Sequence, residues 1–214
     1  HTSGDAGCRY VGEVAASSMT TVEISGHPCT AALLTVPGVG LWYACVDVAD
    51  AVTLSGAITL RFLDTTWQGF IIAGGPVDGR SRYRVVAGAG GWGRALPPKA
   101  YQNDAGLTAA RLLSDAASEA GEVLASPPTT RLGVHFDRPR GPASFALNLL
   151  APRAWHARAD GVVAFGAREA LLTPSLPTVR RDPAGRVVEL AATESVAGIF
   201  PGAPTEYGLS ADVE

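Results

Sequence analysis

The feature that most constrains the fold is a series of short apolar segments, each closed by Gly, Pro or Asp, in residues 1–90. The segments are rich in β-branched and aromatic residues and span 31–36, 41–48, 57–63, 69–73 and 81–87. Such residues favour strands, and Gly, Pro and Asp favour the turns between strands. At this short spacing the strands pair antiparallel, so we expect a β-barrel-like domain over residues 1–90.

Three arginines share one side of the last of these segments. Arg80, Arg82 and Arg84 stand two residues apart, and successive side chains of a strand point to opposite faces. We expect a solvated strand face here, with an anion-binding patch as the alternative.

One helix is predicted over residues 107–120. Leu112, Ala116 and Ala120 recur at every fourth position, with Leu113 and Ala117 beside them, which is the apolar stripe of a helix that packs on one side. Gly121 is placed to end the helix in a left-handed turn.

The rest of the chain is mixed. A short helix is predicted over 142–150 because Pro142 suits a first helical turn, and Asp160-Gly161 predicts a two-residue turn in a hairpin over 154–165. Another strand is expected over 187–191. The fold class is therefore α+β and strand-dominated, with a barrel-like domain over 1–90, a small α/β domain over 91–170 and C-terminal strands over 171–214, which we expect to return to the first domain.

The Gly-rich stretch over residues 86–93 is a candidate dinucleotide-binding motif. Gly88, Gly90 and Gly93 satisfy G-x-G-x-x-G and follow a predicted strand. A dinucleotide site requires a helix that opens at the glycines, so that its N-terminal amides face the pyrophosphate. Pro97 and Pro98 delay the helix by about ten residues, so we expect no cofactor. The stretch is instead interpreted as a connection between barrel and α/β insertion, anchored by Trp92.

Motifs for catalysis or metal binding are not found. No G-x-S-x-G frame surrounds Ser144, which is expected in the first turn of the short helix, and no Gly-Lys-Ser/Thr follows the glycines. His27-Pro-Cys29 lacks a second ligand pair. The remaining candidates are dispersed: His1, His135 and His156, and the carboxylates Asp64, Asp78, Asp104 and Glu119. We therefore expect no catalytic, cofactor or metal site and no enzymatic activity.

Composition limits the partners. A formal charge of −3 gives no long-range attraction for nucleic acid. The apolar runs are shorter than the roughly 20 residues of a membrane-spanning helix, and no signal peptide is expected. Cys8, Cys29 and Cys45 fit no disulfide framework or zinc site, so we expect buried free thiols, with one disulfide as the alternative.

An ordered set of segments lies at 64–72, 84–92, 95–101, 107–122 and 136–144, and continues at Trp155, 160–162 and 200–202. Together these segments resemble the tail hub or baseplate hub proteins of tailed bacteriophages and related injection devices. The resemblance implies a ring-forming, non-enzymatic component at the tip of a tail, made in the host cytoplasm. It also implies self-association, with a trimer favoured, and binding to other tail or baseplate proteins.

Two other functions remain open at this point. A cell-wall hydrolase at a tail tip would use dispersed Asp, Glu or His residues. A carbohydrate- or host-binding module would use tryptophans as stacking platforms, and the chain has four: Trp42, Trp67, Trp92 and Trp155. Large aromatic residues in strand-rich chains more often fill the core.

Overall fold

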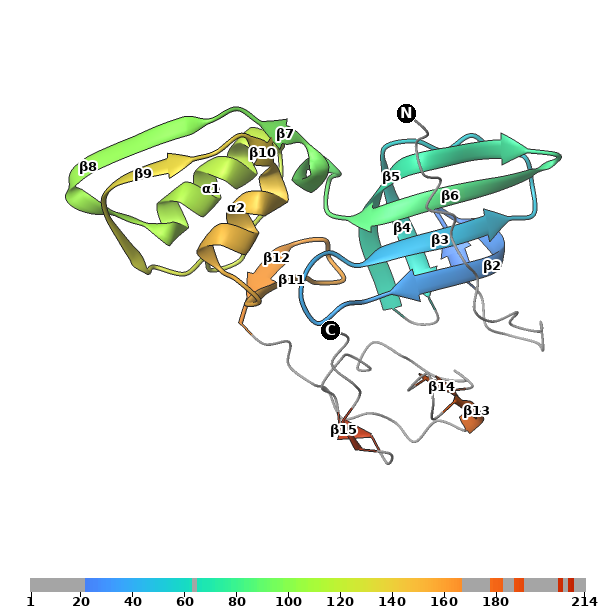
Figure 1. The fold of residues 1–214 in the computed structure, drawn as a ribbon. Helices are drawn as coiled ribbons and strands as arrows, with labels where there is room; N and C mark the ends of the chain where they lie inside the picture. The colour runs from blue at the N-terminus through green and yellow to red at the C-terminus, as the bar shows by residue number, and fades with distance from the viewer. Residues whose placement is uncertain are drawn as a thin grey trace, which may run out of the picture.

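The computed structural model describes residues 22–62 and 65–166, together with four short strands at 178–182, 187–190, 204–205 and 208–209. Figure 1 shows a barrel of strands β1 to β6 beside a small unit that contains both helices. The hairpin of β11 and β12 lies between these two parts. The α+β, strand-dominated fold class is confirmed.

The barrel is a closed antiparallel sheet in the order β1-β2-β3-β6-β5-β4. Closure comes from β1, which pairs with β2 on one side and with β4 on the other. Because every strand has two neighbours, the barrel leaves no strand edge unpaired. Its strands are β1 (Val22–Ile24), β2 (His27–Thr35), β3 (Tyr43–Val48), β4 (Ala57–Phe62), β5 (Thr65–Val77) and β6 (Arg80–Ala87).

Alternation along the strands fills the barrel interior. On β6 the side chains of Ser81, Tyr83 and Val85 are buried, while the arginines between them are exposed. The solvated face expected for Arg80, Arg82 and Arg84 is therefore confirmed. Inside, the rings of Trp42 and Trp67 meet edge to face, with centroids 5.3 Å apart, a favoured aromatic geometry.

The second part is an α/β unit in which a two-stranded ribbon is accompanied by two helices (Figure 1). β8 pairs with β9 along most of its length, and β7 pairs with β10. The elements are a 3₁₀ turn (Gly91–Gly93), β7 (Ala95–Leu96), β8 (Lys99–Thr108), α1 (Ala109–Ala120), β9 (Arg131–Arg138), β10 (Gly141–Pro142) and α2 (Ala143–Leu150).

Both predicted helices are present, but α1 begins two residues later than the predicted 107–120. Leu107 and Thr108 belong to β8, and the hydroxyl of Thr108 accepts a hydrogen bond from the backbone N–H of Arg111 as the N-cap. Gly121 has φ +76 and ends the helix as predicted. Strand β8 itself was not predicted.

The hairpin of β11 (Trp155–Ala157) and β12 (Val163–Phe165) forms, but the predicted two-residue turn is wrong. Ala157 pairs with Val163, so five residues connect the strands. Within the connection, Gly161 has a positive φ of +80 and its N–H donates to the carbonyl of Arg158 at 3.1 Å. Asp160 does not share the positive φ that a tight turn of this type requires at both central positions.

The C-terminal strands form two hairpins. β13 (Thr178–Asp182) pairs with β14 (Val187–Leu190), and β15 (Pro204–Thr205) pairs with β16 (Gly208–Leu209). β14 confirms the strand predicted near residue 187. The division of the chain into domains at about 90 and 170 stays a prediction. Among the described residues, no helix has the length and apolar character needed to cross a bilayer.

Candidate functional site

The Gly-rich stretch forms the joint between the barrel and the α/β unit, and a carboxylate of the chain itself fills it. Both carboxylate oxygens of Glu122 accept from the N–H of Ala89, at 3.1 and 3.0 Å. Oxygen Oε1 also accepts from the N–H groups of Gly91 at 2.6 Å and Trp92 at 3.2 Å. Successive backbone N–H groups of this kind form an anion-binding concavity. Here the anion is Glu122, which is only 8% exposed.

The end of helix α1 directs Glu122 into this position. The N–H of Glu122 donates to the carbonyl of Ala117 at 2.8 Å, and the N–H of Gly121 donates to that of Ser118 at 3.1 Å. These two bonds form a Schellman motif, in which a left-handed glycine reverses the chain after the last helical turn. The residue after the glycine therefore faces back towards the Gly-rich stretch.

Three glycines of the stretch are required because other groups approach their backbone closely. A Cβ on Gly91 would lie 2.0 Å from the carbonyl oxygen of Ala120. A Cβ on Gly90 would lie 2.5 Å from the ring of Phe70, and one on Gly88 would lie 2.5 Å from the carboxylate of Glu122. Gly88 and Gly90 also have φ near +83, a conformation that favours glycine. Close packing thus explains Gly88 and Gly90 of the G-x-G-x-x-G pattern but not Gly93, where a Cβ would meet nothing within 4 Å.

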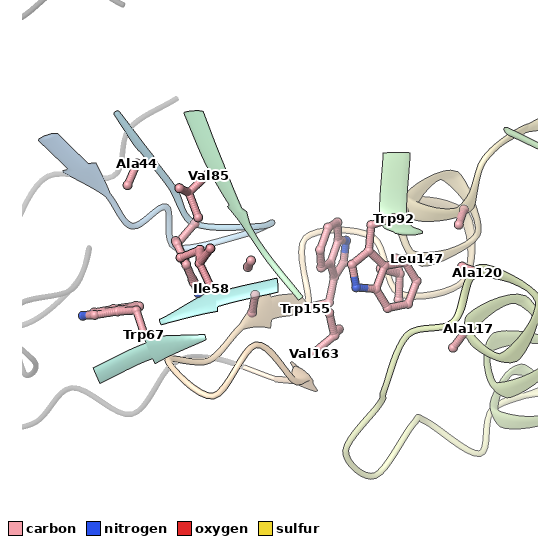
Figure 2. Packing of buried hydrophobic residues seen from close by; sticks show 14 of the residues in the cluster. Ala44, Ile58, Trp67, Val85, Trp92, Ala117, Ala120, Leu147, Trp155 and Val163 are labelled. Carbon is pink, nitrogen blue, oxygen red and sulfur yellow. The ribbon is translucent and has the colours of Figure 1, made fainter. Parts of the chain in front are cut away.

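Trp92 anchors the joint, as predicted. It is 1% exposed and belongs to a core cluster that includes residues from the barrel, the helices and the β11–β12 hairpin. Figure 2 shows Trp92 and Trp155 near each other between the barrel strands and the helices. The expected connection is therefore a packed one.

The β11–β12 hairpin strengthens the joint, because its backbone carbonyls accept hydrogen bonds from both parts. Towards the barrel, the indole of Trp42 donates to the carbonyl of Arg158 at 3.0 Å, and the N–H of Gln68 donates to that of Ala159 at 2.7 Å. Towards the α/β unit, the N–H of Ala125 donates to the carbonyl of Val163 at 2.8 Å. Barrel and α/β unit are joined by these contacts and by the Gly-rich stretch.

A second polar cluster lies in the α/β unit, where α1 contacts the ribbon. The ammonium of Lys99 lies 2.7 Å from Asp115 and 2.8 Å from Glu119. The guanidinium of Arg138 lies 2.7 Å from Glu119, and the hydroxyl of Tyr101 donates to Asp115 at 2.6 Å. The two carboxylates stand four residues apart on α1 and so share one face of the helix.

The charges of this cluster compensate one another. Burial alone would raise the pKa of Asp115, but hydrogen bonds from Lys99 and Tyr101 outweigh it and hold this pKa below its ordinary value. Hydrogen bonds from Lys99 and Arg138 lower the pKa of Glu119. Both carboxyl groups are therefore ionised at neutral pH, whereas a general acid would need a raised pKa. Burial, aided by the hydrogen bond to Asp115, raises the pKa of Tyr101 to about 12.

Sequence reasoning missed both polar clusters. Glu119 was one of the dispersed carboxylates, and the signal that could have paired it was Asp115 at the i−4 position of the same predicted helix. Glu122 carried no comparable signal, because the N–H groups that it accepts from lie 30 to 33 residues earlier in the chain.

The other candidate residues are not brought together. Asp78 lies in the turn between β5 and β6, while Asp104 lies on β8. The exposed His135 contacts Asp137 at 3.0 Å, and Ser144 lies in the first turn of α2 as predicted. His1 and Asp64 lie outside the described residues. Over 22–62 and 65–166, no group of three His, Cys, Asp or Glu residues could hold a metal ion.

The tryptophans, His156 and two of the cysteines lie in the described part of the chain. All four tryptophans are buried, with Trp155 the most exposed at 4%, so they offer no stacking platforms. His156, one of the dispersed histidines, is buried with 7% of its surface exposed, because the hairpin that carries it lies between the two parts. Cys29 is a free thiol whose pKa burial raises to about 11. Cys45 is disulfide-bonded, so the expectation of free thiols is wrong for this residue.

Comparison with solved structures finds a neighbour of similar fold. No protein-family model matches the sequence, and no curated protein sequence matches it. The tail protein from Neisseria meningitidis MC58 is similar in structure, with a TM-score of 0.43 and 15% sequence identity over 74% of this chain. The match covers 52% of the neighbour, so the chain spans about half of its length.

Proposed function

We propose that this chain is a structural component of a phage tail tip or baseplate, or of a related injection device, where it acts as a hub between the tail tube and tip proteins. The main support for a structural role is the Gly-rich stretch, whose backbone N–H groups are occupied by the carboxylate of Glu122. Glu122 occupies the backbone N–H groups that a phosphate would need, and in doing so it fixes the α/β unit to the barrel. This arrangement suits a rigid scaffold.

The tail assignment is supported by the ordered sequence segments that resemble hub proteins. The resemblance implies a barrel-like β domain followed by a small α/β insertion. The fold has its barrel strands first, then the Gly-rich stretch, then the unit with the two helices. We propose no enzymatic activity, no cofactor and no nucleic-acid partner. The proposed location is the virion tail tip, after synthesis in the host cytoplasm, and the proposed partners are copies of this chain, with a trimer favoured, and other tail proteins.

The experiment is to locate the chain in tail particles made by the cell that encodes it. An antibody against the chain, used with immunogold electron microscopy on purified particles, is expected to label one end of the tail. Deletion of the gene is expected to stop assembly of complete tails. The proposal is wrong if purified particles lack the chain and the deletion strain still assembles normal, infectious tails.

A further inference from the structure

Cys45 faces outwards from the barrel and is nevertheless buried. Successive side chains of a strand point to opposite faces. On β3 the residues on either side of Cys45, Ala44 and Val46, fill the barrel interior with at most 1% of their surface exposed. Cys45 therefore shares the outer face with Tyr43, which is 49% exposed, yet only 2% of Cys45 is exposed. The outer face of β3 is thus covered at this point.

A disulfide accounts for the cover. Cys45 is disulfide-bonded, and the Cα atoms of two bonded cysteines lie only about 4.4–6.8 Å apart. The backbone around the second cysteine therefore lies against the outer face of β3. In the register of the barrel, Leu33 on β2 and Arg84 on β6 are the residues beside Cys45 there.

The second cysteine follows from the cysteine count. The chain has three cysteines, Cys8, Cys29 and Cys45. Cys29 on β2 is a free thiol, and it pairs with Val48 rather than with Cys45. Cys8, which lies outside the described residues, is the cysteine that is left to bond Cys45. The occupant of this outer face is therefore the segment that precedes β1.

The length of that segment is sufficient to reach β3. β1 begins at Val22, and the order β1-β2-β3 places β3 two strands away, roughly 10 Å at the usual spacing of strands. β2 and β3 lie side by side in Figure 1. The chain from Cys8 to Val22 spans roughly 45 Å when it is extended at about 3.3 Å per residue. The connection can thus cross β2 and run along β3 as far as Cys45.

We propose that a disulfide between Cys8 and Cys45 fastens the segment before β1 to the outer face of the barrel. The thiolate of one cysteine attacks an external disulfide, and the thiolate of the other then displaces the mixed disulfide. Cys8 and Cys45 are thereby oxidised together, while the external disulfide is reduced to two thiols.

The bond makes the stability of the barrel depend on its redox environment. Thiols in the cytosol are kept reduced, so the disulfide closes after the chain has left the cytoplasm. It closes a loop over residues 8–45, which contains β1 and β2, and such a loop stabilises the fold by constraining the unfolded chain. The inference concerns the barrel alone and does not depend on the hub function.

Cys29 supplies the matched control within the same sheet. It lies on β2, next to β3, and is half-buried. Burial raises the pKa of its thiol to about 11, so little of the reactive thiolate is present at neutral pH. Cys29 therefore stays out of the exchange, and Cys29→Ser should leave the disulfide unchanged.

Peptide mapping and thermal unfolding test the pairing on the full chain. The protein is oxidised with glutathione disulfide, alkylated, and digested without reductant by trypsin and chymotrypsin. Chymotrypsin cleaves after Trp42 and Tyr43, which separates Cys29 from Cys45. Mass spectrometry then identifies the linked peptides. The melting temperatures of the wild type, Cys8→Ser and Cys29→Ser are measured with and without a phosphine reductant.

We expect a linked peptide pair that carries Cys8 and Cys45. Reductant should lower the melting temperature of the wild type and of Cys29→Ser by about 5–10 °C, and it should leave Cys8→Ser unchanged. A link from Cys8 to Cys29, a link between the Cys45 residues of two copies, or an alkylated Cys45 in the oxidised protein overturns the inference. A reductant effect in Cys8→Ser as large as that in the wild type also overturns it. None of these results bears on the hub function.

Discussion

The barrel and the α/β unit reach stability by different routes. The barrel is closed, and its strands alternate buried apolar residues with exposed polar ones, as on β6. The α/β unit has a ribbon of two strands, and a ribbon of this kind needs helices packed on it to be stable. Its contact between ribbon and helix α1 includes the charged cluster of Lys99, Asp115, Glu119 and Arg138.

This difference shows where the fold depends on single residues. A barrel core distributes its free energy over many inward side chains, so local periodicity is sufficient to specify it. The α/β unit also depends on polar contacts at two places, the joint at Glu122 and the charged cluster between α1 and the ribbon.

Matched leucine truncations should distinguish the two cores. Leu60 is fully buried in the main cluster, and Leu112, 1% exposed, belongs to a smaller cluster with Tyr101 and Leu107. Leu→Ala in a core costs about 2–5 kcal/mol, depending on how far the site can collapse. We expect the loss of unfolding free energy, measured by urea unfolding, to lie near the upper end of this range for Leu60→Ala and near the lower end for Leu112→Ala. Equal losses of unfolding free energy in the two variants would contradict the difference between the barrel core and the smaller cluster of the α/β unit.

Two glycine variants test the close packing of the joint. A Cβ at Gly91 would lie 2.0 Å from the carbonyl oxygen of Ala120, whereas a Cβ at Gly93 would meet nothing within 4 Å. We expect Gly91→Ala to lower the free energy of unfolding by about 1–3 kcal/mol through overpacking. Gly93→Ala is the matched control and should change it by less than about 0.5 kcal/mol. If both variants behaved alike, the close approach at Gly91 would be refuted.

Acid should weaken the charged cluster. Because the folded-state pKa values of Asp115 and Glu119 are lowered, their stabilising contribution is present above the unfolded pKa values and is lost as pH falls through the folded ones. Lys99→Met should make the unfolding free energy fall less steeply below about pH 4.5, with a loss near neutral pH of about 1 kcal/mol or less. Arg111→Met is the control, and an unchanged acid slope in Lys99→Met would contradict this account.

Local pattern was sufficient to predict much of the fold. The two-residue spacing of the arginines identified the outer face of β6, and the Leu/Ala stripe with Gly121 identified α1. The prolines after the Gly-rich stretch correctly excluded a helix that opens at the glycines. In each case the deciding interaction lies within one element or its immediate flank, so the sequence carries it directly.

Features that depend on distant residues could not be predicted. Strand β8 contains Asn103, Asp104 and Gly106, which favour turns, and it forms because β9 pairs with it across an irregular register between Gln102 and Leu107. The predicted two-residue turn at Asp160-Gly161 was wrong, because hydrogen bonds tie the hairpin to the barrel at Gln68 and to Val123 and Ala125 beyond α1. The role of Glu122 depends on N–H groups that only the folded chain places beside it.

Hydrogen exchange of three amides tests the central claim that Glu122 closes the joint. In the wild type, the N–H groups of Ala89, Gly91 and Trp92 donate to its carboxylate, so they should exchange slowly. In Glu122→Ala these amides should exchange much faster while those of β3 and β6 stay protected, because the barrel core does not include Glu122. Wild-type exchange rates at all three amides in the variant would contradict the account.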